Sequence, residues 1–300
     1  MTGLRIKQFP WSLQCMTAIW LLSIGTLVVY RRFDAVTIGT DFIFPVLVAI
    51  LAWISTRIVR GDAPPLPASR QPRLMILAQL SVIVAAIALT GMSGLRFHGL
   101  TSTTIPPWDA LIRTIAPLGD VLRIGENQAI NFATYVVLPG VFVLLLGAKV
   151  REIGFERFAP GSWKLAVLWL AFPAIGWIVA LATGQSTIAR MLWQLLRNAL
   201  SNGFSEEFLF RGLLFTRLRA VLSGEVALVL QALVFGLWHF GYDFSSAPNH
   251  NVISALADMF ASQVVIGYGL GWLMLKTGNI VLPSVFHLAI DSLGDAFGAK

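Results

Sequence analysis

Long apolar runs separated by short polar connections make up most of the chain. Many of the runs approach the roughly 20 residues that a helix needs to cross a bilayer, and none shows strand-like alternation. The apolar runs lie at 11–30, 43–58, 74–92, 130–148, 163–181, 226–239, 255–275 and 280–297, with a longer helical region at 187–222. Because lipid excludes open sheet edges, the pattern predicts an all-α, polytopic transmembrane helix bundle of about eight spans, within a range of seven to nine.

The polar connections predict how the chain crosses the membrane. Lys and Arg are more numerous in the connections on the N-terminal side, so the N-terminus is expected to be cytoplasmic. The first run is as long as a full span and is followed by Arg31 and Arg32, which favours a retained helix over a cleaved signal peptide. The stretch 60–73 is a Pro-rich linker, and 101–127 is expected to contain an interfacial amphipathic helix.

Composition supports a membrane protein and argues against a nucleic-acid partner. Hydrophobic residues make up 56% of the chain and charged residues only 12%, about half the share of a soluble domain. The net charge of +7 is distributed over the connections, as membrane topology requires. We therefore expect a multi-pass protein whose partners include the lipid bilayer but no nucleic acid. The compact form favours a prokaryotic cell membrane.

Six ionisable side chains interrupt the apolar segments of the C-terminal half. They are Glu206, Glu207, Arg211, His239, His287 and Asp291. Such groups are costly inside a membrane and normally face the interior of a helix bundle. Glu207 and Arg211 are four residues apart, as are His287 and Asp291, and this spacing places each pair on one helix face.

The two adjacent glutamates are expected to differ in role. Arg211 can neutralise Glu207, which lowers the cost of burying both. Glu206 is rotated by about 100° from Glu207 on an α-helix and cannot easily share that partner. A poorly solvated carboxylate without a counter-ion suits a general base. A purely structural interpretation also exists, in which Glu207 pairs with Arg211, and His287 with Asp291, only to hold helices together.

Three short motifs connect these residues to a known family. The stretches EEFLFR, FGLWH and HLAID occur in this order and correspond to Glu-Glu-x-x-x-Arg, Phe-x-x-x-His and His-x-x-x-Asx. Together they resemble the CPBP family of intramembrane proteases, which includes the type II CAAX prenyl endopeptidases (Rce1-like) and relatives linked to bacteriocin self-immunity. The resemblance divides the chain into residues 1–185, N-terminal transmembrane helices without a recognised motif, and residues 186–300, a CPBP-like catalytic helical core.

The resemblance implies a role for each polar residue of the first two motifs. Glu206 resembles the catalytic base that activates water, and His239 resembles its partner in that activation. Glu207 and Arg211 resemble a supporting pair that orients the site. The implied enzyme is a membrane-embedded peptidase of the glutamate or metallo type that needs no serine or cysteine nucleophile.

The third motif departs from the pattern of many relatives at its last position. The resemblance implies that His287 and Asp291 stabilise the developing oxyanion, but many relatives carry Asn where this chain has Asp291. An ionised Asp cannot donate a hydrogen bond to an oxyanion. We therefore expect Asp291 to orient His287 by accepting a hydrogen bond from its ring.

Cofactor and substrate remain open at the level of sequence. No cofactor is favoured, although Glu206, His239 and His287 could hold a zinc ion with water as the fourth ligand. The expected substrate is a peptide or protein, which could be lipid-modified as for the eukaryotic relatives. Two other functions compete with proteolysis. One is a non-catalytic binding or immunity protein of the same fold, and the other is a proton-coupled transporter that uses the buried Glu and His residues as a relay.

Overall fold

The structure, a computed structural model, describes residues 10–30, 38–59 and 71–297. Regular structure in these residues is helical, apart from one isolated bridge between Phe155 and Asn279. The α-helices are α1 (Trp11–Tyr30), α3 (Phe44–Ile58), α4 (Arg73–Phe97), α5 (Pro106–Val121), α6 (Glu126–Asn131), α7 (Leu138–Leu145), α8 (Ser162–Ala182), α9 (Ile188–Ser201), α10 (Gly203–Glu207), α11 (Thr216–Leu218), α12 (Gly224–Ser246), α13 (Val252–Ala261), α14 (Gln263–Thr277) and α15 (Val281–Ala296). Three π-helical segments, η1 (Ile38–Ile43), η2 (Phe132–Val137) and η4 (Phe208–Phe215), and two short 3₁₀ segments, η3 (Val150–Ile153) and η5 (Pro248–His250), complete the fold. The all-α prediction is confirmed.

Seven helical stretches of the described chain are long and apolar enough to cross a membrane. They are Trp11–Tyr30, Asp41–Ile58, Arg73–Phe97, Glu126–Leu145, Ser162–Ala182, Gly224–Ser246 and Val252–Thr277. This number lies within the predicted range, and the protein is an integral membrane protein. The predicted Pro-rich linker lies largely at 60–70 and the Arg31–Arg32 pair at 31–37, both outside the described residues.

The long helical region predicted at 187–222 is divided in the structure. The α9 helix ends at Ser201, and Asn202 leaves the helical conformation with φ −122° and ψ −82°. The chain then turns into α10, whose backbone at Gly203 approaches α15 closely. A break at this point directs the Glu206–Glu207 pair towards the last helix.

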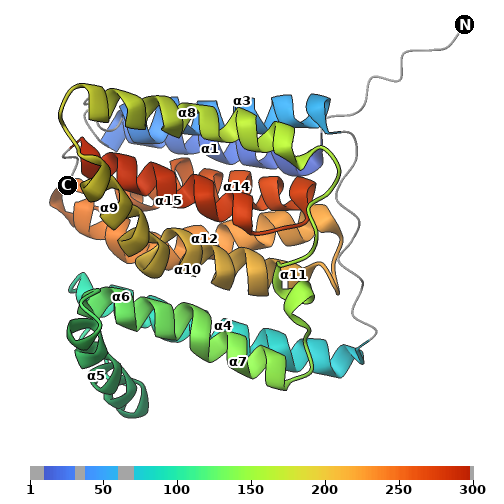
Figure 1. Cartoon of the computed structure of the whole chain (residues 1–300), viewed down its shortest axis with the longest axis vertical. Coiled ribbons are helices and arrows are strands. Elements are labelled where there is room, and N and C mark those ends of the chain that lie inside the picture. Colours follow the sequence, from blue (N-terminus) through green and yellow to red (C-terminus); the bar gives the residue numbers. More distant parts are fainter. Residues whose placement is uncertain (1–9, 31–37, 60–70, 298–300) are drawn as a thin grey trace, which may run out of the picture.

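The helices form three layers, with the motif-bearing helices in the middle one (Figure 1). The α12, α14 and α15 helices lie between α1, α3 and α8 on one side and α4 and α7 on the other (Figure 1). The α5 helix lies apart from the bundle at an angle to it, as expected for an interfacial helix (Figure 1). It is tied to the end of α4 by an ion pair between Asp109 and Arg96 and a 2.8 Å hydrogen bond from Trp108 Nε1 to Ser93 Oγ.

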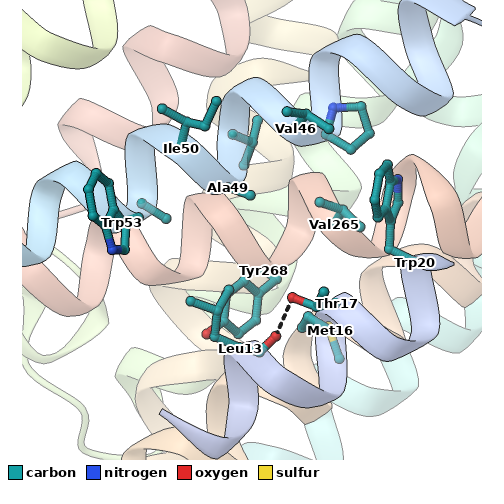
Figure 2. A pocket seen from close by; sticks show the side chains of 13 residues that line it. Leu13, Met16, Thr17, Trp20, Val46, Ala49, Ile50, Trp53, Val265 and Tyr268 are labelled. Carbon is teal, nitrogen blue, oxygen red and sulfur yellow. Dashed lines mark hydrogen bonds between the residues drawn. The ribbon is translucent and has the colours of Figure 1, made fainter. Parts of the chain in front are cut away.

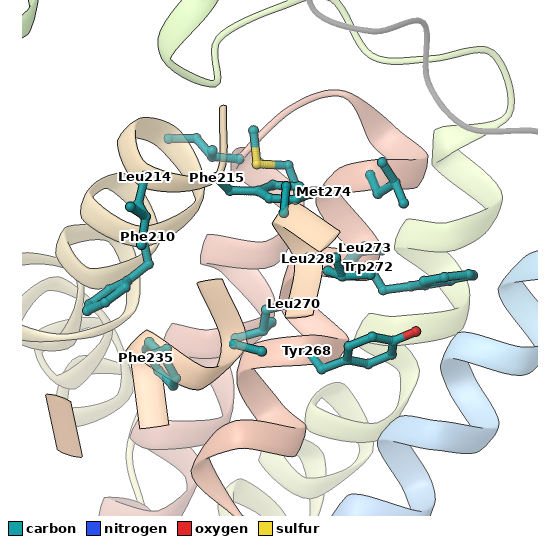
Figure 3. Packing of buried hydrophobic residues seen from close by; sticks show 14 of the residues in the cluster. Phe210, Leu214, Phe215, Leu228, Phe235, Tyr268, Leu270, Trp272, Leu273 and Met274 are labelled. Atoms are coloured by element: carbon teal, nitrogen blue, oxygen red, sulfur yellow. The ribbon is translucent and has the colours of Figure 1, made fainter. Parts of the chain in front are cut away.

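The apolar core surrounds α14 and extends to the helices that carry the first two motifs. Figure 3 shows Phe210 and Phe215 from η4 and Phe235 from α12 in this cluster, together with side chains of α14. Close approach of α12 to α14 depends on Gly267, because a Cβ atom there would lie 3.0 Å from the Phe235 ring and 3.3 Å from the Ala232 backbone. The glycine therefore lets α12 approach α14 closely at the level of the second motif.

Candidate active site

Glu206 and His239 face each other inside the bundle. Oε2 of Glu206 lies 3.6 Å from Nε2 of His239, and the two side chains are only 7% and 16% exposed. Glu206 comes from α10 and His239 from α12, so the contact depends on tertiary packing. Oε2 of Glu206 is buried and has no hydrogen-bond partner among the described residues. A buried carboxylate oxygen without a donor is uncommon in a native protein and points to a functional position.

The other ring nitrogen of His239 fixes the state of the imidazole. Nδ1 lies 2.9 Å from the backbone oxygen of Phe235, one helical turn earlier. Since a carbonyl oxygen can only accept, Nδ1 carries the proton, and in the neutral ring Nε2 is left with a lone pair. His239 and Glu206 therefore present two acceptor atoms to each other, an arrangement that a water molecule can bridge by donating to both.

Glu207 connects the first and third motifs. Its Oε1 accepts a hydrogen bond from Arg211 Nη1 at 2.8 Å, the pair that their spacing predicts, and a second from His287 Nδ1 at 2.9 Å. Arg211 Nη2 also donates to the backbone oxygen of Gly267 at 2.9 Å. Glu207 and Arg211 are fully buried. One ion pair thus holds α10, η4, α14 and α15 around the site.

Phe235, the first residue of the second motif, lies beside the guanidinium and the two imidazoles of the site. The Arg211 guanidinium lies 4.3 Å from the centre of its ring, within the range of a cation–π interaction. The ring centres of His239 and His287 lie 4.5 Å and 6.3 Å from it. The spacing Phe-x-x-x-His therefore has a physical reason, since it places the phenyl ring and the imidazole of His239 on the same side of α12, in contact with each other.

The structure changes the interpretation of Asp291. Its Oδ2 lies 3.6 Å from Nε2 of His287, an ion-pair distance that is too long for a hydrogen bond. The hydrogen bond to the ring comes from the other nitrogen and goes to Glu207. The expectation that Asp291 orients His287 through a hydrogen bond is therefore corrected, because Glu207 holds the ring and Asp291 only flanks it.

Several residues that position the site have no signal of their own in the sequence. Gln231 donates from Nε2 to the same Gly267 oxygen that Arg211 uses, at 2.8 Å. Gly203 has no room for a side chain, because a Cβ atom would lie 2.5 Å from Leu288 Cβ and 2.7 Å from its backbone nitrogen. Contacts of this kind depend on which helices become neighbours, which local patterns do not reveal.

The described residues do not form the zinc site that the sequence left open. No group of three His, Cys, Asp or Glu side chains among them is arranged to hold a metal ion. Nδ1 of His287 is bonded to Glu207 at 2.9 Å, and Nε2 lies 3.6 Å from Oδ2 of Asp291, so a carboxylate lies beside each ring nitrogen. Glu206, His239 and His287 in this geometry do not fit a shared zinc ion.

An apolar cavity of about 300 Å³ lies elsewhere in the bundle, between α1, α3 and α14 (Figure 2). Its lining includes Trp20, Trp53 and Tyr268 and none of the residues of the three motifs. The cavity is therefore separate from the candidate site.

A comparison with known protein families matches the part of the chain that contains the candidate site. Residues 188–293 match the family described as type II CAAX prenyl endopeptidase Rce1-like. The match begins with α9 and ends within α15, and it includes all three motifs. No curated protein matches the chain, and no solved structure does.

Proposed function

We propose that this chain, whose residues 188–293 match the type II CAAX prenyl endopeptidase Rce1-like family, is an intramembrane endopeptidase of the CPBP type that cleaves a peptide bond with a water activated by Glu206 and His239. The observation that carries this proposal is the pair of facing acceptors, Glu206 Oε2 and His239 Nε2, 3.6 Å apart in a buried position. A water that donates to both presents its oxygen lone pair to a substrate carbonyl.

In the proposed reaction, the water oxygen forms a bond to the carbonyl carbon while Glu206 takes a proton from the water. The negative charge develops on the carbonyl oxygen. Glu206 then returns the proton to the amide nitrogen as the carbon–nitrogen bond breaks, which leaves a carboxylic acid and an amine. His239 holds the water, and the charged network of Glu207, Arg211 and His287 keeps the site rigid. We propose that no metal ion takes part.

We propose that His287 of the third motif stabilises the negative charge on the carbonyl oxygen through one of its two ring nitrogens. Two carboxylates flank the His287 ring, one at each nitrogen, and this stabilises its charged form. The hydrogen bond to Glu207 leaves Nε2 as the only nitrogen that can contribute to an oxyanion, close to Asp291. The resemblance implies that His287 and Asp291 stabilise the oxyanion. In this chain one nitrogen of His287 is already bonded to Glu207 and cannot contribute.

Proteolysis is favoured over the two competing functions. A binding or immunity protein gains nothing from an unpartnered buried carboxylate oxygen, which costs free energy unless it has a use. A proton relay requires titratable groups that continue to both membrane faces, whereas Glu206, Glu207, His239, His287 and Asp291 gather at one place.

The test compares cells that contain the wild type with cells that contain Glu206→Gln or His239→Ala. Both variants are expected to insert and fold normally and to lose all cleavage, because Glu206→Gln removes the base that takes the proton and His239→Ala removes an acceptor that holds the water. Glu126→Gln, an equivalent change at an exposed position, serves as the control and should cleave normally. The readout is a membrane proteome searched for new C-termini, which also identifies the substrate. A Glu206→Gln variant that generates the same new termini as the wild type would refute the proposal.

A further inference from the structure

Arg211 and His287 use most of their hydrogen-bond donors within the network, and among the described residues only Nε of Arg211 is a buried guanidinium nitrogen without a partner. Both terminal nitrogens of Arg211 are bonded, one to Glu207 and one to the Gly267 oxygen. Nδ1 of His287 is bonded to Glu207. Hydrolysis of a peptide bond nevertheless needs a donor directed at the carbonyl oxygen, since that is where charge accumulates. The site therefore needs a free O–H or N–H group that can reach this carbonyl oxygen.

Tyr135 brings such a group from the N-terminal part of the chain. It lies in η2, a π-helical turn within the Glu126–Leu145 span, and is 8% exposed. Its ring stands edge to face on Trp238, with ring centres 5.3 Å apart and an angle of 82° between the planes. Trp238 precedes His239 and is itself fixed by a 3.0 Å hydrogen bond to Thr90. Tyr135 is thereby held one aromatic ring away from the second motif.

The contacts of η2 extend to the catalytic glutamate. The segment contacts both α10, which carries Glu206, and η4, which carries Arg211. The Trp238 ring, against which Tyr135 packs, lies 4.8 Å from the His239 ring between centres, so a chain of ring contacts joins Tyr135 to the second motif. Two π-helical turns, η2 and η4, therefore meet at this position. Turns of this kind are rare and occur frequently at functional sites.

Within the described residues no hydrogen bond joins the Tyr135 hydroxyl to another group, and its oxygen is not among the fully buried atoms without a partner. Tyr268 provides the contrast, because its hydroxyl lies 3.0 Å from Ser12 Oγ on the opposite side of the bundle. The phenol of Tyr135 is thus a weakly acidic donor, held by its ring and unused by the fold.

We propose that Tyr135 is a further catalytic residue, whose phenol O–H donates a hydrogen bond to the scissile carbonyl oxygen as that oxygen becomes an oxyanion. This inference rests on the proposed function. The tyrosine keeps its proton throughout, so the proton balance between water, Glu206 and the leaving amine is unchanged. The proposal assigns a catalytic group to the N-terminal part of the chain, before the family match begins at residue 188.

The first test is Tyr135→Phe, which keeps the ring and its contact with Trp238 and removes only the O–H group. The kcat for a cleaved peptide is expected to fall by about 10²-fold, the usual effect of losing one oxyanion donor, while KM and the melting temperature in detergent change little. Tyr268→Phe is the matched control and should keep the wild-type kcat. A Tyr135→Phe variant with wild-type kcat overturns this inference alone, whereas a wild type that cleaves nothing overturns it together with the proposed function.

A second measurement needs no turnover. Incorporation of 3-fluorotyrosine at position 135 allows the ¹⁹F resonance of the phenol to be recorded in the full-length protein in detergent. Glu206→Gln is expected to shift this resonance, because it removes a charge from α10, which η2 contacts, and Glu126→Gln should leave it unmoved. A resonance that does not respond to Glu206→Gln would mean that the phenol does not face the base, and the inference would then be wrong even in an active protease.

Discussion

His287 donates from Nδ1 to Oε1 of Glu207 over 2.9 Å, and this bond joins the last helix to α10, which carries Glu206, the proposed base. The same oxygen accepts from Arg211, so one carboxylate neutralises a guanidinium and orients an imidazole. The side chains of Glu207, Arg211 and His287 are all buried. The second glutamate of the motif therefore supports the geometry of the first.

The first prediction concerns the charge balance of this network. Glu207→Gln leaves Arg211 buried without its counter-ion, so we expect a loss of about 3–5 kcal/mol of stability, measured by thermal unfolding in detergent. The double variant Glu207→Gln/Arg211→Met removes both charges and should regain most of that stability without regaining activity, because His287 still lacks its anionic partner. Equal stability of the single variant and the wild type would show that the pair is energetically neutral.

The second prediction tests how closely α10 must approach α15. Gly203→Ala would place a Cβ atom 2.7 Å from the backbone nitrogen of Leu288, a contact that no rotamer change can relieve. The two helices must then separate, and Glu206 moves away from the other motifs. We expect kcat to fall at least about tenfold, because small displacements of catalytic groups are costly.

Gly294→Ala is the control for this substitution. Gly294 also lies in a helix of the motif region, but a Cβ atom there would meet nothing within 4 Å. Alanine has a higher helix propensity than glycine, so the control should be as stable as the wild type or more stable by up to about 1 kcal/mol. If both alanine variants were equally active, the close approach at Gly203 would have no functional importance.

The sequence predicts the polar residues of the site better than it predicts their partners. Spacing of four residues correctly indicates the pairing of Glu207 with Arg211, because an i,i+4 contact is local to one helix. The bond from His287 to Glu207 joins residues 80 positions apart and depends on how α10 packs on α15. This difference explains why the local spacing indicates Asp291, and not Glu207, as the residue that orients His287.

The same limit applies to the fold. Apolar runs predict the helices because each run must bury its own backbone hydrogen bonds in lipid. The break at Asn202 and the π-helical turns η2 and η4 are decided by packing against neighbouring helices, so no local pattern reveals them. Tyr135 is the clearest case, since an isolated tyrosine in an apolar run resembles any packing residue until Trp238 is found against it.

The third prediction concerns the departure of this chain from its relatives at the last motif position. Asp291 is 31% exposed and lies 3.6 Å from His287, so their attraction is screened and is worth about 1 kcal/mol or less. Asp291→Asn should therefore lower kcat/KM by no more than about fivefold, measured with the peptide substrate. Glu207→Gln in the same assay should lose far more, because it removes the anionic partner that holds the ring. A hundredfold loss in Asp291→Asn would mean that this carboxylate contacts the reacting groups directly.

The last prediction separates a glutamate protease from a metalloprotease. Both nitrogens of His287 face carboxylates, and no three ligands among the described residues converge on one point. The activity of purified protein should therefore be unchanged after prolonged treatment with 1,10-phenanthroline and with EDTA, and elemental analysis of the active preparation should give less than one zinc ion per ten molecules. A known zinc protease in the same detergent and chelator provides the control for effective metal removal. Inactivation by chelator that zinc reverses would return Glu206, His239 and His287 to the role of metal ligands, and it would require His287 to leave Glu207 in the active state.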